Sequence, residues 1–540
     1  MTDDLGRGRR RWNGWGGEGT DFPLKPKALA FLADRLGGPG TRLPDATLDA
    51  VIARVPPSRL PLHPLVSTDP ETRVRNARGH SFPDWLALRS GRFERFPDGV
   101  ALPTTGAEVG DVLRWAHHAG FTVIVRGGGT SVAGHVDIPA SATPVLVLSL
   151  ERLDRLMHLD PESRIATFGA GATGPAIERQ LATRGFTLGH FPQSWELSTV
   201  GGWVAARSSG QQSRRYGRIE QLFAGGRIET PHGSWRLPSV PASAAGPDLR
   251  EMVLGSEGRI GALTEVDLRV TPTAEHESFH VAFLPSWEAG VALLHRLIDR
   301  EVPLSMMRLS NPHETVAHLA LGGDHPLFAV FDHAVTALGA KPGARTMFTF
   351  GVTGPKRRAR RALSEALSAI RGFGGVTLAH GAMGKIWEHS RFRSPYFRNG
   401  LWEHGYSVDT VETAVDWSRV DATMAAVETA IRTAAGGEPI LVFSHLSHVY
   451  AQGCSVYTTY VFANAGDYDT LASRWRALKT AASDAIVASG GTISHQHGVG
   501  RDHAPWLVHE KGDQGLAAIR AVVDAFDPEH RLNPGCLLED

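Results

Sequence analysis

The chain has 540 residues, enough for two or three domains with complete cores, and its 42% hydrophobic and 21% charged residues are typical of a soluble globular protein. Acidic and basic residues balance at 56 each, which argues against nucleic acid or an anionic membrane as the main partner. The two cysteines, Cys454 and Cys536, cannot make a disulfide framework and favour a reducing compartment.

The first segment, residues 1–94, is predicted to be mostly helical. It lacks the apolar stretch of a signal peptide, and no run of about 18 apolar residues predicts a membrane span anywhere in the chain. The arginine-rich run 7–11 has the character of a solvated tail, while Trp12 and Trp15 are expected to clamp the segment onto a neighbouring domain. Four prolines interrupt any helix in its second half: Pro56, Pro57, Pro61 and Pro64.

The most informative stretch comes next. Thr105 and Glu108 have the spacing of a capping box, Gly120 ends the predicted helix, and the β-branched run 121–125 predicts a buried strand. The loop 126–131 (RGGGTS) then brings bare backbone N–H groups together, which is typical of a nest for the pyrophosphate of a nucleotide. The loop lacks the lysine of a Walker motif and the following helix of a Rossmann fingerprint. A tight glycine turn is the alternative.

Three further turns are rich in glycine and small residues, at 191–203, 205–210 and 252–263. Strands are predicted between them and the first loop at 144–148 and 164–168, with a helix at 174–184. Packing alone hardly explains four such turns, so we expect one long polyanionic cofactor held between two sub-lobes.

From about residue 271 longer helices alternate with β-like runs, which predicts a second α+β domain. Near the end of the chain His495 and His497 flank Gln496. In an extended segment both imidazoles point to one side, as a pair of acid/base groups would, although a structural histidine is the alternative for each. The predicted helices are 287–299, 356–371 and 419–434, and the predicted strands are 279–284, 346–352 and 457–462.

The motifs GGGTS, STVGGW and GSEG resemble the flavoproteins of the vanillyl-alcohol-oxidase and p-cresol-methylhydroxylase (PCMH) type. Within that superfamily the chain is most similar to the alkyl-dihydroxyacetonephosphate synthases, through RWNGWG, GGGTSV, SWELSTVGGWVAARSSG, AAGPD, GSEGRIG and SHQHGVG. The resemblance covers nearly the whole chain and implies an α+β fold. Its parts would be a helical N-terminal segment 1–94, a two-lobed PCMH-type FAD-binding domain 95–272, a cap or substrate domain 273–490, and a C-terminal segment 491–540 that returns to the flavin site.

The resemblance implies FAD as the cofactor. Many relatives attach FAD covalently through a histidine in the first glycine loop, and because 126–132 contains none, we expect FAD to be bound non-covalently. The residues implied to wrap it are Arg126, Gly127, Gly128, Gly129, Thr130, Ser131, Val132, Gln193, Ser194, Ser198, Thr199, Ala206, Arg207, Ser208, Ser209, Glu257, Gly258, Ile260 and Gly261.

Catalytic roles are implied in the same way. Tyr457, which by itself reads as a core strand tyrosine, matches the general acid/base of the synthases. His495 and His497 match two members of a histidine triplet that those enzymes need, and Gln496 replaces the middle one. His445 and His448 resemble, together with the first pair, the metal-binding histidines of some 2-hydroxy-acid dehydrogenases. Because the accompanying GDGN run is missing, we predict no metal and expect His448 to form a polar wall of the active site.

Arginine is expected to hold the substrate phosphate, because a guanidinium fork suits that dianion. Arg398 matches the substrate-binding arginine of the synthases, with a surface ion pair as the alternative, and Arg308 is a weaker candidate. Ala242 stands where the synthases carry an arginine, which is a second departure from their pattern.

The leading hypothesis is an enzyme that exchanges the acyl group of acyl-dihydroxyacetonephosphate for a fatty alcohol through a flavin adduct, in ether-lipid synthesis. The runner-up is an FAD-dependent oxidoreductase of a 2-hydroxy acid or a glycerol-phosphate-like alcohol, and a structural or lipid-binding flavin fold is the third. We expect a small phosphorylated, lipid-like substrate and no nucleic acid. We also expect a homodimer in a bacterial cytoplasm, peripheral to the membrane if the substrate is a lipid.

Overall fold

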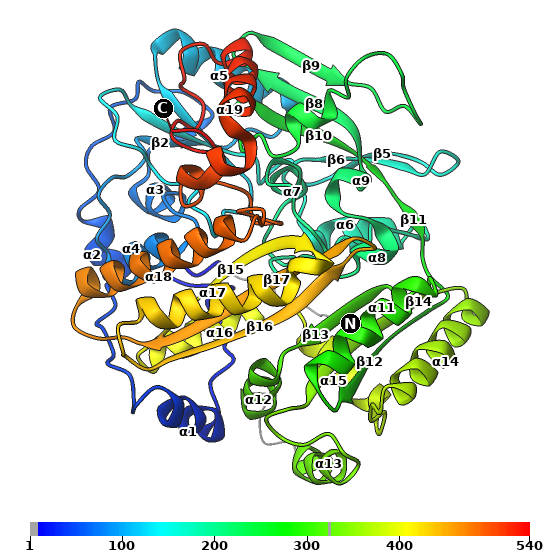
Figure 1. The fold of residues 1–540 in the computed structure, drawn as a ribbon. Coiled ribbons are helices and arrows are strands. Elements are labelled where there is room, and N and C mark those ends of the chain that lie inside the picture. Colours follow the sequence, from blue (N-terminus) through cyan, green and yellow to red (C-terminus); the bar gives the residue numbers. More distant parts are fainter. Residues whose placement is uncertain (1–8, 322–325, 540) are drawn as a thin grey trace.

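The computed structural model describes residues 9–321 and 326–539. Figure 1 shows two α+β domains, the first in its upper half and the second below it, with the red C-terminal helix returning to the top. The predicted α+β fold is therefore confirmed. None of the helices in the described part of the chain combines the length and the apolar character that a membrane span requires.

The N-terminal segment is mostly loop, so the prediction of a mostly helical segment is wrong. Prolines and glycines separate its short helices, and the chain is held by packing against both domains instead. Trp15 confirms the predicted clamp: it packs with Leu197 of the first domain and Tyr396 of the second. The backbone of Trp15 also exchanges hydrogen bonds with the side chain of Asn399, at 2.9 and 3.1 Å. The helices are α1 (Pro26–Arg35), α2 (Leu48–Ile52), α3 (Pro70–Arg75) and α4 (Phe82–Ser90).

The first lobe of the first domain contains the predicted helix and strand before the glycine loop. Thr105 and Glu108 form the predicted capping box, and Gly120 ends the helix in the left-handed region. Three short strands are parallel in the order β2-β4-β3, with β1 antiparallel at the edge. The elements are β1 (Val66–Ser67), β2 (Gly99–Ala101), α5 (Gly106–Ala119), β3 (Thr122–Arg126) and β4 (Val145–Ser149).

The second lobe is an antiparallel sheet in the order β5-β6-β10-β8-β9. One hydrophobic core, which includes Val123, Phe168 and Val266, joins it to the first lobe. The elements are β5 (Leu156–Asp160), β6 (Ile165–Gly169), α6 (Gly174–Ala182), β7 (Phe186–Thr187), α7 (Val200–Ala205), α8 (Ser213–Tyr216), α9 (Ile219–Leu222), β8 (Phe223–Thr230), β9 (Gly233–Leu237), α10 (Arg250–Val253), β10 (Ala262–Arg269) and β11 (Thr271–Pro272).

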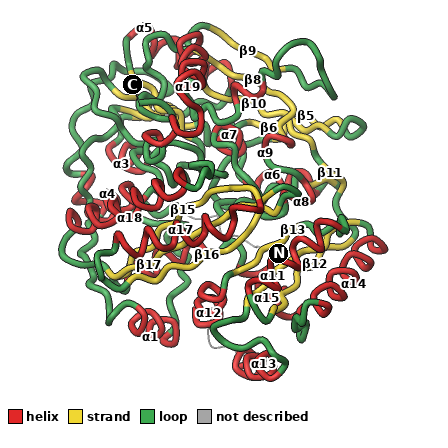
Figure 2. The backbone as a smooth tube through the Cα atoms, in the orientation of Figure 1, coloured by secondary structure: helices red, strands yellow, loops and turns green. Residues whose placement is uncertain are grey.

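The second domain is built on a six-stranded antiparallel sheet in the order β12-β14-β13-β16-β17-β15. Helices α11, α14 and α17 cover its apolar face, and Figure 2 shows α11 and α17 lying across the strands. All three predicted helices and all three predicted strands of this domain are present. The elements are β12 (His276–Leu284), α11 (Trp287–Asp299), β13 (Met306–Ser310), α12 (Pro312–Leu321), α13 (Pro326–Ala337), β14 (Thr346–Gly354), α14 (Lys356–Gly372), α15 (His380–Ser390), α16 (Ser394–Glu403), β15 (Tyr406–Asp416), η1 (Trp417–Arg419), α17 (Val420–Ala434), β16 (Ile440–Val449), β17 (Gly453–Ala463) and α18 (Tyr468–Ala488).

The C-terminal segment crosses back to the first domain through η2 (Ala504–Trp506) and α19 (Leu507–Phe526). It extends the first sheet, because Val123 donates to the Arg531 carbonyl and Asn533 donates to the Val123 carbonyl, both at 2.8 Å. Leu532 and Leu538 enter the core of the first domain. The loop that carries His495 and His497 is thus held between the two domains.

Candidate active site

The glycine loop after β3 presents a row of free backbone donors. Within the described structure, none of the six N–H groups of residues 127–132 donates a hydrogen bond to another part of the chain. The loop packs closely against the next predicted turn: a Cβ on Gly128 would overlap the carbonyl oxygen of Leu197, and one on Gly127 would overlap the hydroxyl of Thr199. The two turns therefore form one cradle whose donors suit an anion.

Positive charge surrounds this cradle. Arg10 donates to the carbonyls of Gly128 at 2.9 Å and Leu197 at 3.4 Å, so the described part of the run 7–11 is not the solvated tail that we predicted. Burial lowers the pKa of Arg126 to about 10, with Arg10 adding to the shift. The Nε atom of Arg126 and the Thr199 hydroxyl are buried and lack a hydrogen-bond partner in the described structure. These free donors and cations fit a pyrophosphate group.

Of the other residues predicted to bind FAD, some face the interior of the protein and others face solvent. Ser198 and Ser208 lie in the same region, where Ser198 accepts from the Trp203 indole and Ser208 contacts His190, both at 2.7 Å. The Ser209 hydroxyl lies 3.0 Å from Nδ1 of His448, which links the turn after α7 to the second domain. Arg207 instead turns outward and pairs with Glu251 at 2.8 Å. Gln193 is exposed.

Glu257 is a structural anchor in the last of the glycine turns. Its buried carboxylate accepts from the N–H groups of Val499 at 2.5 Å and Gly500 at 2.8 Å, and it lies 3.1 Å from His135. Burial favours the protonated form, but His135 and the two N–H groups outweigh it and lower the pKa of Glu257. The Glu257 side chain therefore joins the first domain to the loop that carries His495 and His497 (the histidine loop).

Tyr457 lies on the face of the second-domain sheet opposite to the one that α11, α14 and α17 cover. Glu412 on β15 and His445 on β16 are its cross-strand partners, so the three side chains share one face. The His445 ring stacks on Tyr457 with 4.9 Å between centroids, and the His497 ring lies edge-on at 5.9 Å. Burial raises the pKa of Tyr457 above its ordinary value, so the phenol is neutral and keeps its proton at neutral pH, and its hydroxyl donates to Thr410 at 3.1 Å.

Glu412 holds the loop that carries His495 and His497 in place, although no local sequence pattern marks it as a functional residue. One carboxylate oxygen accepts from the N–H groups of Gln496 at 2.7 Å and His497 at 3.0 Å, and lies 3.3 Å from Nδ1 of His497. The other oxygen lies 3.8 Å from Nδ1 of His495. Burial opposes ionisation, but the two histidines and the Gln496 N–H keep the pKa of Glu412 far below its ordinary value.

His495 faces two donors that sequence reasoning also missed. Its Nε2 lies 2.5 Å from Arg218 and 2.8 Å from the Tyr450 hydroxyl. Because a guanidinium only donates, Nε2 is the acceptor and the ring proton sits on Nδ1, toward Glu412. Burial lowers the pKa of His495 although Glu412 opposes the shift, so the imidazole is neutral at neutral pH. The His448 ring lies 5.0 Å away, and burial, with His495 and Arg218 beside it, lowers the pKa of His448 too.

Arg308 lies beside this cluster, on the same face of the sheet. Its guanidinium donates to buried Glu314 at 2.9 Å and lies 3.2 Å from Nδ1 of His445, the histidine that stacks on Tyr457. Burial, and then the Arg308 charge, lowers the pKa of His445 to about 4. A cation is therefore held one side chain away from the tyrosine.

Arg398 belongs to a different environment. It stacks over the Trp85 ring at 4.5 Å and donates to the His80 carbonyl at 2.7 Å, and its Nε and Nη2 lack a partner in the described residues. Its charge interacts with Asp409 of β15. Asp409 is three residues from Glu412, and because side chains alternate along a strand, it points to the opposite face of the sheet. The structure therefore does not bring the two predicted phosphate-binding arginines together.

Two further predicted features lie outside the cluster. Ala242 is exposed in the loop between β9 and α10. In the described residues, two groups of side chains could hold a metal ion, His117–His232–Glu529 and His135–Glu257–Cys536. Neither group includes the histidines considered for a metal from the sequence, which are His445, His448, His495 and His497.

Comparisons with known proteins identify both domains of the chain. The FAD binding domain family matches residues 97–237, and the C-terminal domain family of the FAD linked oxidases matches residues 273–537. An alkyldihydroxyacetonephosphate synthase of Trypanosoma brucei brucei is 29% identical over 98% of this chain and 92% of its own. A D-2-hydroxyglutarate dehydrogenase of Xanthomonas citri is 23% identical over 84% of this chain and 91% of its own.

The fold has a close counterpart among solved structures. A structure of alkyldihydroxyacetonephosphate synthase superposes with a TM-score of 0.84 at 24% identity and covers 97% of this chain and 98% of that one. This superposition confirms the predicted fold, and the two family matches and the synthase relative confirm the predicted type of flavoprotein and the FAD cofactor. The cradle at 127–132, with the guanidinium groups of Arg10 and Arg126 beside it, is the feature of this structure that fits the pyrophosphate of FAD. The chain is an FAD-dependent enzyme that carries the FAD binding domain and the C-terminal domain of the FAD linked oxidases.

Proposed function

We propose that this protein is an alkyl-dihydroxyacetonephosphate synthase, which exchanges the acyl group of acyl-dihydroxyacetonephosphate for a fatty alcohol. The observation that carries the proposal is the cluster around Tyr457, whose buried, neutral phenol lies between the rings of His445 and His497. The guanidinium of Arg308 contacts the His445 ring. A synthase relative that matches nearly the whole chain supports it. The exchange moves protons and needs an anchor for a phosphate, and both kinds of group are present.

The reaction leaves the substrate neither oxidised nor reduced: a fatty acid departs, and a fatty alcohol gives up its hydroxyl proton as it enters. FAD, when bound, supplies the ring at which the carbon skeleton is held during the exchange. Tyr457 is the proposed proton carrier, because its phenol is neutral and buried. His497, 5.9 Å away ring to ring, is the proposed partner that relays the proton to and from it.

The experiment is anaerobic absorbance of the purified yellow protein. We expect acyl-dihydroxyacetonephosphate to bleach the flavin band, and a fatty alcohol to restore it without oxygen or any electron acceptor. A band that is bleached instead by an alcohol, and returns only with an acceptor, contradicts the synthase proposal.

That second outcome supports the alternative, an oxidoreductase of a 2-hydroxy acid or a glycerol-phosphate-like alcohol. The observation in its favour is the pair of buried neutral imidazoles, His448 and His495, 5.0 Å apart. One neutral imidazole can take the hydroxyl proton of such a substrate while hydride leaves for the flavin. Glutamine at position 496 in place of a third histidine also favours it.

Both candidate functions need a site for an anionic head group, and we propose Arg308 for it. Replacing Arg308 with lysine is expected to raise KM for the phosphorylated substrate by about 10-fold, because lysine keeps the charge but loses the guanidinium fork. The matched variant is Arg398→Lys, which is expected to change KM little and to lower thermal stability, because its stacking on Trp85 is lost. Steady-state kinetics and thermal unfolding of both variants test this prediction. If KM rises in the Arg398 variant and stays unchanged in the Arg308 variant, Arg398 is the phosphate ligand instead.

A further inference from the structure

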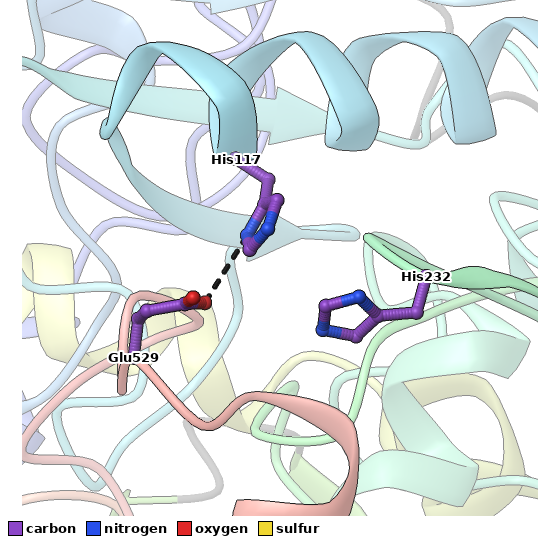
Figure 3. Close-up of side chains that lie close together, drawn as sticks. All are labelled: His117, His232 and Glu529. Atoms are coloured by element: carbon purple, nitrogen blue, oxygen red, sulfur yellow. Dashed lines mark ion pairs between the residues drawn. The ribbon is translucent and has the colours of Figure 1, made fainter.

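Three side chains from distant parts of the sequence meet on the surface of the first domain, away from the active site. His117 lies in the last turn of α5, His232 in the turn between β8 and β9, and Glu529 after α19. Nδ1 of His117 is 3.2 Å from Glu529, and the His117 and His232 rings lie 5.0 Å apart at 76°. Figure 3 shows the His232 ring directed toward the gap beside the other two.

The chemistry of this trio is that of a metal site. One ligand atom from each side chain lies within 4.8 Å of the other two. Two imidazole nitrogens and a carboxylate oxygen are a known ligand set for zinc, with water in the fourth position. Zinc bonds of about 2.0–2.1 Å require the ligand atoms to lie roughly 3.3 Å apart. His232 and Glu529 are exposed and can make the small rotations that close the remaining distance.

The backbones that carry the trio are already fixed. The Thr230 hydroxyl accepts from the His232 N–H at 3.1 Å and donates to the Gly233 carbonyl at 2.9 Å, which sets the turn. Arg531 follows Glu529 and pairs with Val123 of β3 through its carbonyl, while its guanidinium donates to the His117 carbonyl at 3.3 Å. The cost of ordering the ligands on binding is therefore confined to side-chain rotations.

We propose that His117, His232 and Glu529 bind a divalent cation of the zinc class, and that this ion fastens the C-terminal segment to the first domain. The position of this segment matters because, four residues after Glu529, the segment reaches the cofactor side of the domain. There the Asn533 side chain donates to the Glu257 carbonyl at 2.8 Å, and the Cys536 thiol contacts the Glu257 carboxylate at 3.2 Å.

The test uses tag-free, FAD-loaded full-length protein that has been stripped with EDTA and dialysed. Zinc binding is measured by equilibrium dialysis, and thermal unfolding is followed with and without zinc. We expect one zinc ion per chain and a rise of the unfolding temperature that EDTA reverses. His232→Ala and Glu529→Gln are each expected to weaken binding by about 10-fold or more and to remove the thermal shift.

The matched control is His118→Ala, because His118 neighbours His117 on the same helix but turns its Nδ1 to the Arg114 carbonyl at 2.6 Å. This variant is expected to bind zinc like the parent protein. FAD content and zinc-free unfolding temperature show that each variant is folded, since the residues changed are exposed. If the parent protein binds no zinc, or if the His232 and Glu529 variants bind it unchanged, the trio is only an ion pair beside a histidine and the proposal is wrong.

Discussion

Replacing Glu412 with glutamine is expected to lower kcat by about 100-fold or more, while FAD stays bound. The carboxylate of Glu412 orders the histidine loop by accepting two backbone N–H groups, and its second oxygen faces the Nδ1 proton of His495. In the variant an amide NH2 faces that proton, so two donors oppose each other. The imidazole keeps the tautomer that Arg218 sets at Nε2, but it loses the negative charge that faces its Nδ1 proton.

The pH dependence of kcat/KM distinguishes this prediction from a general loss of stability, which would not shift the pKa of His495. The Glu412 charge raises the pKa of His495 against the effect of burial, so removing the charge lowers that pKa further. If the neutral imidazole is the active form, activity is lost as pH falls through this pKa. The acidic limb of kcat/KM therefore moves to lower pH in the variant. Glu229→Gln, a buried carboxylate on β8 of the first domain, serves as the control, and an unshifted limb with unchanged kcat would remove Glu412 from the catalytic machinery.

The sequence predicted the second domain well because its elements carry strong local signals. The helix α11 ends where its apolar spacing ends, and Ser286 caps its start by accepting from the Ala289 N–H. The strand with Tyr457 was predicted for the same reason. The register of this strand against β15, which places Glu412 opposite Tyr457, could not be predicted. The alternation of side chains along the two strands permits several registers.

The missed site residues have no local signature. Arg218 follows the short helix α8 and Tyr450 follows β16, and only the packing of the two domains brings both to Nε2 of His495. Arg398 shows the converse limit. The residue type suits a phosphate, but the sequence does not say which face of the sheet it approaches, and the structure places it with Trp85 and His80.

Gly128→Ala is expected to lower FAD affinity by about 10- to 100-fold, so that the protein is purified with much less of its yellow colour. The added methyl group would overlap the carbonyl oxygen of Leu197. That carbonyl cannot simply turn away, because the Leu197 and Ser198 N–H groups both bond to Ser194, at 3.0 and 2.9 Å, and hold the turn closed. The two turns of the cradle are therefore forced apart, at a cost typical of overpacking, about 1–3 kcal/mol.

Gly202→Ala in the neighbouring helix α7 is the matched control for this substitution. A Cβ at Gly202 meets only the Thr199 hydroxyl, at 3.5 Å, which is an ordinary contact, and alanine favours the helix. FAD content from visible absorbance and affinity from flavin fluorescence check both variants, with unfolding of the FAD-free proteins recorded alongside. Overpacking by itself lowers the stability of the FAD-free protein and leaves affinity unchanged once the chain is folded. A loss of affinity in the folded Gly128 variant therefore assigns the donors of residues 127–132 to the cofactor, whereas parental affinity would show that the cradle lies elsewhere.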